Sequence, residues 1–189
     1  MILGRYTRQG LWSLFLMCAL PLHAWTLVLA FRDLSWLTDR TNSWDAIGVL
    51  CYGLLFAFVE SVLVFLISAL LGLITPRRWD SRRRVGFMSA LVLVLSVWAM
   101  LEQLYFLADV RLPDAFLAFL VNSAHPLRVL YTVIPAIVII TFAIPVYLIL
   151  RSERGVQVMT SIIDRLGLLA SFYLVFDVAA VVVVVIRNV

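Results

Sequence analysis

Five polar side chains in this sequence lie inside long apolar runs, where an ionisable group is costly. His23, Glu60 and Asp177 fall near the middles of three runs, and Glu102 and Gln103 lie toward the end of a fourth. A group of this kind in hydrocarbon costs several kcal/mol, so each is a candidate functional residue by default. We expect these side chains to converge inside a helix bundle.

The charge state of these acids admits more than one role. No arginine lies at their depth, so each carboxyl group must be protonated, hydrogen-bonded to a neighbour such as Ser61, or paired with His23. A chain of protonatable groups could relay protons or bind a cation. The commoner role of such residues is to hydrogen-bond across helices and fix their packing, and this second hypothesis is favoured.

Histidine and cysteine give no clear cofactor site. His23 and His125 could be axial ligands of haem or chlorophyll, but no pair has the spacing of a bis-histidine site, and His125 directly precedes Pro126 in a loop. Cys18 and Cys51 each lie in an apolar run, without a CxxC or Cys/His spacing. The sequence therefore predicts no cofactor, no metal site and no disulfide.

A second polar group brackets an apolar segment too short to cross a membrane. Arg111, His125 and Arg128 flank the predicted helix at 113–123, which we expect to lie in the outer interface between the third and fourth spans. Arginine binds phosphate through paired donors, so these three residues are candidates for contact with lipid headgroups. Ordinary snorkelling of the side chains toward the headgroups is the alternative.

The composition indicates that these candidate residues belong to a membrane protein. The chain of 189 residues is 64% hydrophobic and 14% charged, with a mean hydropathy of +1.06, far from the usual balance of soluble domains. All 15 basic residues are arginines, and they lie almost wholly between the apolar runs. The pI of about 9.5 therefore reflects membrane orientation, and no nucleic-acid partner is predicted.

The apolar runs predict an all-α, polytopic membrane helix bundle in a single domain, residues 1–189. The five predicted transmembrane helices are residues 11–31, 47–74, 85–108, 129–150 and 166–186. The first run is longer than the apolar region of a signal peptide, and no convincing cleavage site follows it. We therefore expect it to be a retained helix.

The arginines are distributed unequally between the two sides of these spans. One side carries ten and the other five, and the densest cluster is Arg77, Arg78, Arg82, Arg83 and Arg84. The positive-inside rule then predicts a cytoplasmic N-terminus and an extracytoplasmic C-terminus, as in a bacterial inner membrane protein. Residues 151–165 alternate charged and apolar side chains, and we expect them to lie along the inner surface.

One stretch resembles a known family. Residues 101–123, LEQLYFLADVRLPDAFLAFLVNS, are similar to the junction between the third span and the short helix in the N-terminal membrane domain of the sulfatase-like phosphoglycerol transferases, which include lipoteichoic acid synthase. That domain also has three spans, a short outer helix and two more spans. The family's catalytic domain follows the fifth helix, whereas this sequence ends at Val189. The resemblance thus implies a membrane anchor that contacts lipid.

No water-facing catalytic motif is present, whether a nucleophile elbow, a P-loop or an HExxH sequence. We expect a non-catalytic membrane module that anchors or scaffolds another membrane subunit or a separate extracytoplasmic domain, and that contacts membrane lipids. Two alternatives stay open, a proton- or ion-coupled transporter or channel subunit, and an accessory subunit of a respiratory or photosynthetic complex.

Overall fold

The structure is a computed structural model and describes residues 5–108 and 113–189. Within these ranges the chain forms helices and no strands, which confirms the all-α prediction. The helices are α1 (Arg8–Arg32), α2 (Leu34–Arg40), α3 (Ser43–Ile74), α4 (Ser81–Leu107), α5 (Asp114–Val121), α6 (Pro126–Arg151) and α7 (Glu153–Asn188). Five of them, α1, α3, α4, α6 and α7, are long and apolar enough to cross a membrane, as expected.

Four of the five long helices begin where a polar side chain caps the first turn. The first amide groups of a helix have no intrahelical acceptor, and a side-chain oxygen at the N-cap supplies one. The capping residues are Thr7 of α1, Asn42 of α3, Asp80 of α4 and Ser152 of α7. In α1, α3 and α4 the cap lies a few residues before the apolar run, whereas α7 begins 13 residues before its run.

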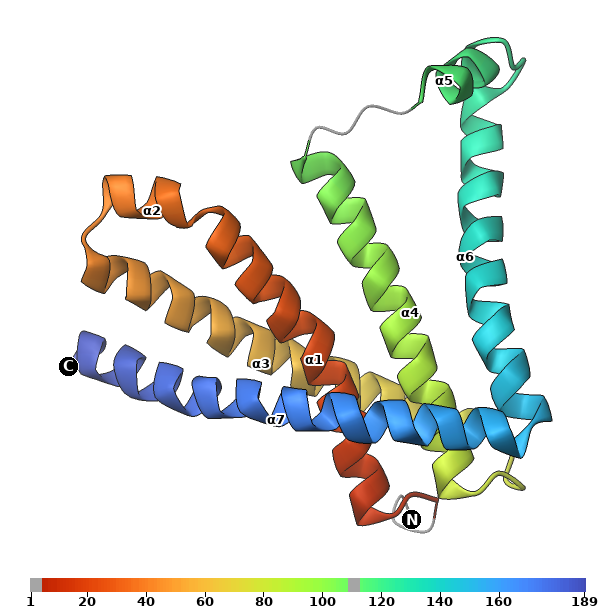
Figure 1. Cartoon of the computed structure of the whole chain (residues 1–189), viewed down its shortest axis with the longest axis horizontal. Coiled ribbons are helices and arrows are strands. Elements are labelled where there is room, and N and C mark those ends of the chain that lie inside the picture. Colours follow the sequence, from red (N-terminus) through yellow and green to blue (C-terminus); the bar gives the residue numbers. More distant parts are fainter. Residues whose placement is uncertain (1–4, 109–112) are drawn as a thin grey trace.

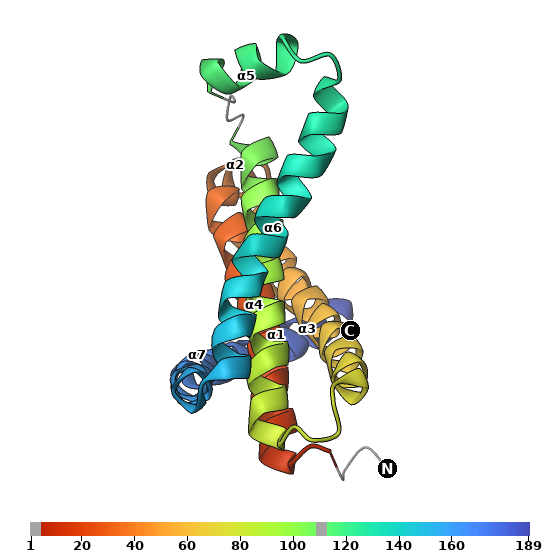
Figure 2. The same ribbon diagram turned by 90° about the vertical axis from the view of Figure 1, so that its right-hand side faces the viewer.

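The helices form a packed group and a diverging arm (Figures 1 and 2). Helices α1, α3 and α7 run side by side, and α2 joins α1 to α3. Helices α4 and α6 pack on this group near one end and then lead away from it, with α5 at the far end of α6. We call the end where α1, α4 and α7 begin the basic end, because the cluster Arg77–Arg84 lies there.

Most of the buried apolar residues belong to one cluster near the basic end, and α1 lies at its centre. Helix α1 contacts α3, α4 and α7, and its residues Leu14, Met17 and Cys18 are fully buried. A smaller cluster of Cys51, Leu54 and Ala180 joins α3 to α7 toward the other end. By contrast, no residue of α6 from Pro126 to Ile144 is buried.

Two elements differ from the sequence prediction. Helix α7 is continuous over 36 residues, and the segment expected along the inner surface is its first part. Val156, Met159 and Ile163 are buried in the main cluster, so packing against the bundle replaces contact with a surface. Helix α2 was not predicted. Helix α5 is present as a helix, while its interfacial placement stays a prediction.

Candidate functional site

The structure brings together two of the polar residues predicted inside the spans. His23 of α1 is fully buried, and its Nε2 lies 3.0 Å from each carboxylate oxygen of Asp177, which is 5% exposed on α7. The other ring nitrogen, Nδ1, lies 2.8 Å from the carbonyl oxygen of Ala19 one turn earlier. The imidazole ring also stacks on Tyr173, with 5.9 Å between ring centroids and an interplanar angle of 7°.

The partners of His23 define how many protons the pair holds. A carbonyl oxygen can only accept, so Nδ1 must carry a proton and donate it to Ala19. A second proton then lies between Nε2 and the Asp177 carboxyl group, bonded either to the nitrogen or to a carboxyl oxygen. The pair is neutral overall in both forms, because one form is imidazolium with carboxylate and the other is imidazole with carboxylic acid. Loss of that proton would leave a net negative charge in a buried place.

The spacing of small residues on α7 explains why Asp177 reaches α1. The buried stripe of this helix includes Gly167, Ala170, Asp177 and Ala180, at separations of three and seven residues. Small side chains allow two helix backbones to approach closely, and a polar side chain in the same stripe then meets the neighbouring helix. This register is the sequence signal that singles out Asp177 from the other acids.

Glu60 does not join the pair. It lies in the middle of α3 on an exposed face, and no hydrogen bond or ion pair of its carboxyl group occurs in the ranges that the structure covers. Its neighbour Ser61 is buried and donates instead to the carbonyl of Ala57, 2.6 Å away. The predicted convergence of all the acids is therefore not seen, and Glu60 projects from the bundle.

The polar residues of α4 are also exposed. Gln103 accepts a hydrogen bond from the indole of Trp25 on α1, and this contact ties the two helices near the end opposite the basic end. Glu102 beside it is exposed and has no hydrogen bond within residues 5–108 and 113–189. It lies close to the end of α4, which ends at Leu107.

The predicted headgroup residues lie at the corner between α5 and α6. His125 and Arg128 are exposed, and neither side chain has a hydrogen-bond partner in the part of the chain that is described. Arg111 lies outside the described residues. Their role in contacting lipid stays a prediction.

The arginine cluster at the basic end separates into one buried and four more accessible side chains. Arg84 is 1% exposed, and its guanidinium lies 5.5 Å from the centre of the Tyr6 ring. It donates hydrogen bonds to Thr75 Oγ1 and to the carbonyl oxygens of Arg5, Pro76 and Trp79. Burial raises the pKa of the Tyr6 phenol, and the Arg84 charge opposes this shift.

The other members of this cluster have surface roles. Arg77, Arg78 and Arg82 are exposed, and Arg83 pairs with the exposed Glu153 of α7 at 2.8 Å. Arg84 therefore differs from its neighbours, because it joins the N-terminal segment to the connection between α3 and α4. Sequence reasoning assigned all five arginines to membrane orientation and missed this structural role. Its position one turn after the Asp80 cap, facing inward with Val85 and Met88, was the available signal.

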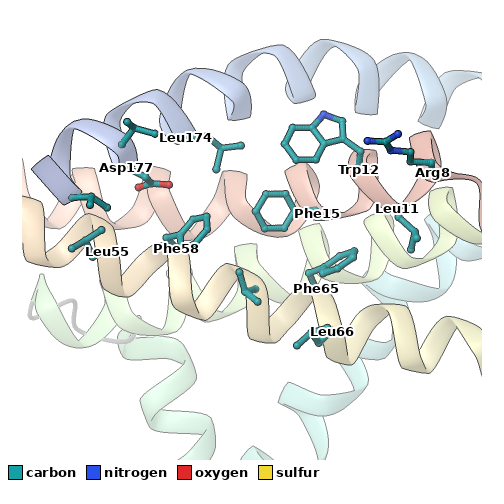
Figure 3. Close-up of a pocket in the computed structure, with 13 residues that line it drawn as sticks. Arg8, Leu11, Trp12, Phe15, Leu55, Phe58, Phe65, Leu66, Leu174 and Asp177 are labelled. Atoms are coloured by element: carbon teal, nitrogen blue, oxygen red, sulfur yellow. The ribbon is translucent and has the colours of Figure 1, made fainter. Parts of the chain in front are cut away.

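An apolar groove lies beside the buried pair, between α1, α3 and α7 (Figure 3). Its volume is about 830 Å³, and its lining is almost entirely apolar. Arg8 stands at one end, near Trp12, and Asp177 stands at the other (Figure 3). Phe15 packs edge-on against Phe58 and Phe65, with ring centroids 6.3 and 5.7 Å away, which fixes the wall between α1 and α3.

The contacts of His23 bear on whether it could be an axial ligand of haem or chlorophyll. Both ring nitrogens of His23 are engaged, so this residue has no free nitrogen for an axial bond to a metal. No group of three or more His, Cys, Asp or Glu side chains able to hold a metal ion occurs among the residues described. The arrangement provides a neutral polar contact between two helices, an isolated acid on α3 and an apolar groove.

The fold and these sites are those of a helical chain with five helices suited to cross a membrane. Comparison with protein-family models, with curated proteins and with solved structures finds no match to the chain.

Proposed function

We propose that this chain is a non-catalytic membrane module that holds a partner membrane protein against the exposed face of α3. The observation that carries the proposal is Glu60, an acid in the middle of an apolar helix whose exposed face would meet lipid in a bilayer. An uncompensated carboxyl group at that depth costs roughly 3 kcal/mol on insertion scales. A polar side chain on a partner helix would remove much of that cost.

The residues around Glu60 support a helix as the partner. Exposed large side chains follow α3 at intervals of three or four residues, the spacing of a helix-packing seam. We call this seam the α3 outer face, and it comprises Tyr52, Phe56, Val59, Leu63, Ile67, Leu70 and Ile74. Large apolar residues alone would be equally satisfied by lipid, so the acid beside them gives the face its specificity.

The excess of arginine at one end supports a cytoplasmic basic end and an extracytoplasmic C-terminus in a bacterial inner membrane. The order of helices also supports the anchor role, because a short helix between the third and fourth long helices resembles the membrane domain of the sulfatase-like phosphoglycerol transferases. A partner docked on α3 would then be carried in a fixed orientation across the membrane.

The test is native purification of the tagged chain in a mild detergent, followed by mass spectrometry of the intact assembly. We expect the wild-type chain to elute with a second membrane protein in constant ratio. Glu60→Leu should lose the partner, and Glu60→Gln should keep much of it, because an amide still makes hydrogen bonds. Glu102→Leu, an exposed acid on another helix, is the matched control and should keep the partner.

Two results would contradict this function. If the wild-type chain is always purified alone, or only with copies of itself, it has no partner membrane protein and the proposal is wrong. Retention of the partner by Glu60→Leu at the wild-type ratio would show that the α3 outer face is not the docking surface.

A proton- or ion-coupled carrier is the second candidate, favoured by the place of Asp177 at the end of the groove and in contact with His23. It predicts that transport by reconstituted protein depends on the shared proton. Proton flux into proteoliposomes that is absent, or that is unchanged in Asp177→Asn and Glu60→Gln, would exclude the carrier.

A further inference from the structure

The groove between α1, α3 and α7 has a direction, because its two ends differ in chemistry. Arg8 at the basic end is exposed, and its side chain has no acidic partner in the described part of the chain. The other end closes on Asp177, whose side chain is 7% exposed and is matched by His23. One end can therefore receive an anion, and the rest offers an apolar path without an unmatched charge.

The length of the groove fits a single hydrocarbon chain along the axis of α1. Arg8 and His23 are 15 residues apart on this helix, which corresponds to about 22 Å. That distance is less than the roughly 30 Å of a bilayer core and exceeds half of it, so a chain starting at the basic end would reach past the middle of the membrane. The groove is therefore shorter than a membrane-spanning element and long enough to hold a chain that enters from one leaflet.

The lining favours a hydrocarbon chain as the occupant. Phe15 packs edge-on against Phe58 and Phe65, and all three side chains line the groove. Apart from Arg8 at one end and Asp177 at the other, every residue that lines the groove is aliphatic or aromatic. An acyl chain matches this lining, because it brings no polar group that would be left without a partner.

The groups beside Arg8 fit the polar part of a phospholipid. Trp12 lines the groove one turn beyond Arg8, and its indole N–H has no acceptor among the residues that the structure describes. Arg5 and Arg77 line a second, polar pocket at the same end, where Asp80 is occupied in capping α4. A guanidinium binds a phosphate through paired donors, and an indole at this level donates to an ester carbonyl.

We propose that this groove binds one acyl chain of an anionic phospholipid from the leaflet at the basic end. The phosphate binds Arg8, the ester carbonyl accepts from Trp12, and the chain follows the groove toward Asp177. This site lies on a different face of α3 from the α3 outer face, so it does not depend on the proposed partner.

Native mass spectrometry of the detergent-purified chain tests the site. The probes are dioleoylphosphatidylglycerol and dioleoylphosphatidylcholine, which share acyl chains and differ in headgroup charge. We expect one tight site that prefers phosphatidylglycerol about tenfold. Arg8→Gln should abolish this preference, whereas Arg78→Gln, an exposed arginine at the same end that does not line the groove, should leave it within about twofold.

A second pair of variants tests the groove itself. Val178 and Val175 are both exposed on α7, at 67% and 65%, but Val178 alone of the two lines the groove. Val178→Trp should remove the tight site for both lipids, and Val175→Trp should keep it. Val62→Trp and Leu71→Trp repeat this comparison on α3, should a variant of α7 fail to fold. Val62 lines the groove, whereas Leu71 is 43% exposed and does not line it.

Either of two results would overturn the lipid site. Equal losses of phosphatidylglycerol binding in Arg8→Gln and Arg78→Gln would show diffuse attraction to a basic surface. A tight site that survives both Val178→Trp and Val62→Trp would place the lipid elsewhere on the chain.

Discussion

Helices α1 and α6 have similar lengths and similar apolar character, yet they are packed in opposite ways. Helix α1 touches three other long helices and carries the buried residues Leu14, Met17, Cys18 and His23. Helix α6 has no buried residue from Pro126 to Ile144 and packs on α4 and α7 mainly near the basic end. Hydropathy therefore identifies both helices but does not tell the centre of the bundle from its edge.

The largest loss of stability is expected from substitution of Arg84, whose side chain joins the segments at the basic end. Arg84→Met removes the donor from four oxygen atoms, and each orphaned acceptor costs about 1–3 kcal/mol unless water replaces the arginine. We expect a loss of about 4 kcal/mol in the free energy of unfolding. Thermal unfolding in detergent measures it, with labelling of the two buried thiols, Cys18 and Cys51, as the readout.

Arg83→Met is the neighbouring control. Its side chain forms an exposed ion pair with Glu153, which contributes less than about 1 kcal/mol. Similar melting shifts for Arg83→Met and Arg84→Met would show that charge, rather than the buried contacts, holds this end together.

A comparison of matched apolar truncations addresses α1 and α6 directly. Leu14→Ala should cost about 3 kcal/mol, because Leu14 is fully buried and its removal leaves a cavity. Ile139→Ala should change the stability by less than about 0.5 kcal/mol, because Ile139 is 64% exposed. The same thiol-labelling melt measures both. If Ile139→Ala were as costly as Leu14→Ala, α6 would be covered by something outside this chain.

A pair of glycine substitutions tests how closely the helices and Tyr6 pack at the basic end. A Cβ at Gly72 would collide with the Tyr6 hydroxyl and lie 2.9 Å from the ring carbon that carries it. Gly72→Ala should therefore cost about 1–3 kcal/mol through overpacking. A Cβ at Gly86 meets Met159 at an ordinary 3.6 Å, so Gly86→Ala should stabilise by up to about 1 kcal/mol. Melting shifts of the same sign would contradict the close approach of Tyr6.

The smallest effect is expected where α6 is tied to α4. The Trp98 indole donates to Thr141 Oγ1 at 2.9 Å, and hydrogen bonds between membrane helices contribute about 0.6 kcal/mol on average. Thr141→Val should change global stability little but widen the distance distribution between spin labels placed at Leu104 and Leu127, which are both exposed. Thr132→Val, which loses only a bond to its own helix, should leave that distribution unchanged.

The sequence was sufficient to predict the number and approximate positions of the long helices, because about 20 apolar residues between polar connections are required to cross a membrane. It did not distinguish Asp177 from Glu60, since both are acids in the middle of apolar runs. The distinction arises from the register of small residues on α7, which places Asp177 against His23, whereas Glu60 faces away from the bundle. Counting acids within apolar runs was therefore not enough, and the register of the small residues around each acid was also needed.

The continuity of α7 was also not evident from its composition. Charged residues at 151–165 suggested a separate surface element, because charge in a span is costly. In the structure this segment projects beyond the apolar part of the same helix, where Glu153 pairs with Arg83 and the apolar side chains turn inward. The helical spacing of Val156, Met159 and Ile163, rather than the mean hydropathy of the segment, was the sequence signal for this packing.

Helix α7 links the two ends of the bundle without interruption. It is unbroken over 36 residues, contains no proline, and is held by ion pairs at both ends, Glu153 to Arg83 and Arg187 to Asp45. At 1.5 Å per residue it is about 54 Å long, well beyond the bilayer core. The first turn of α4 and the first turn of α3 are therefore tied to opposite ends of one continuous helix, which sets the separation between them.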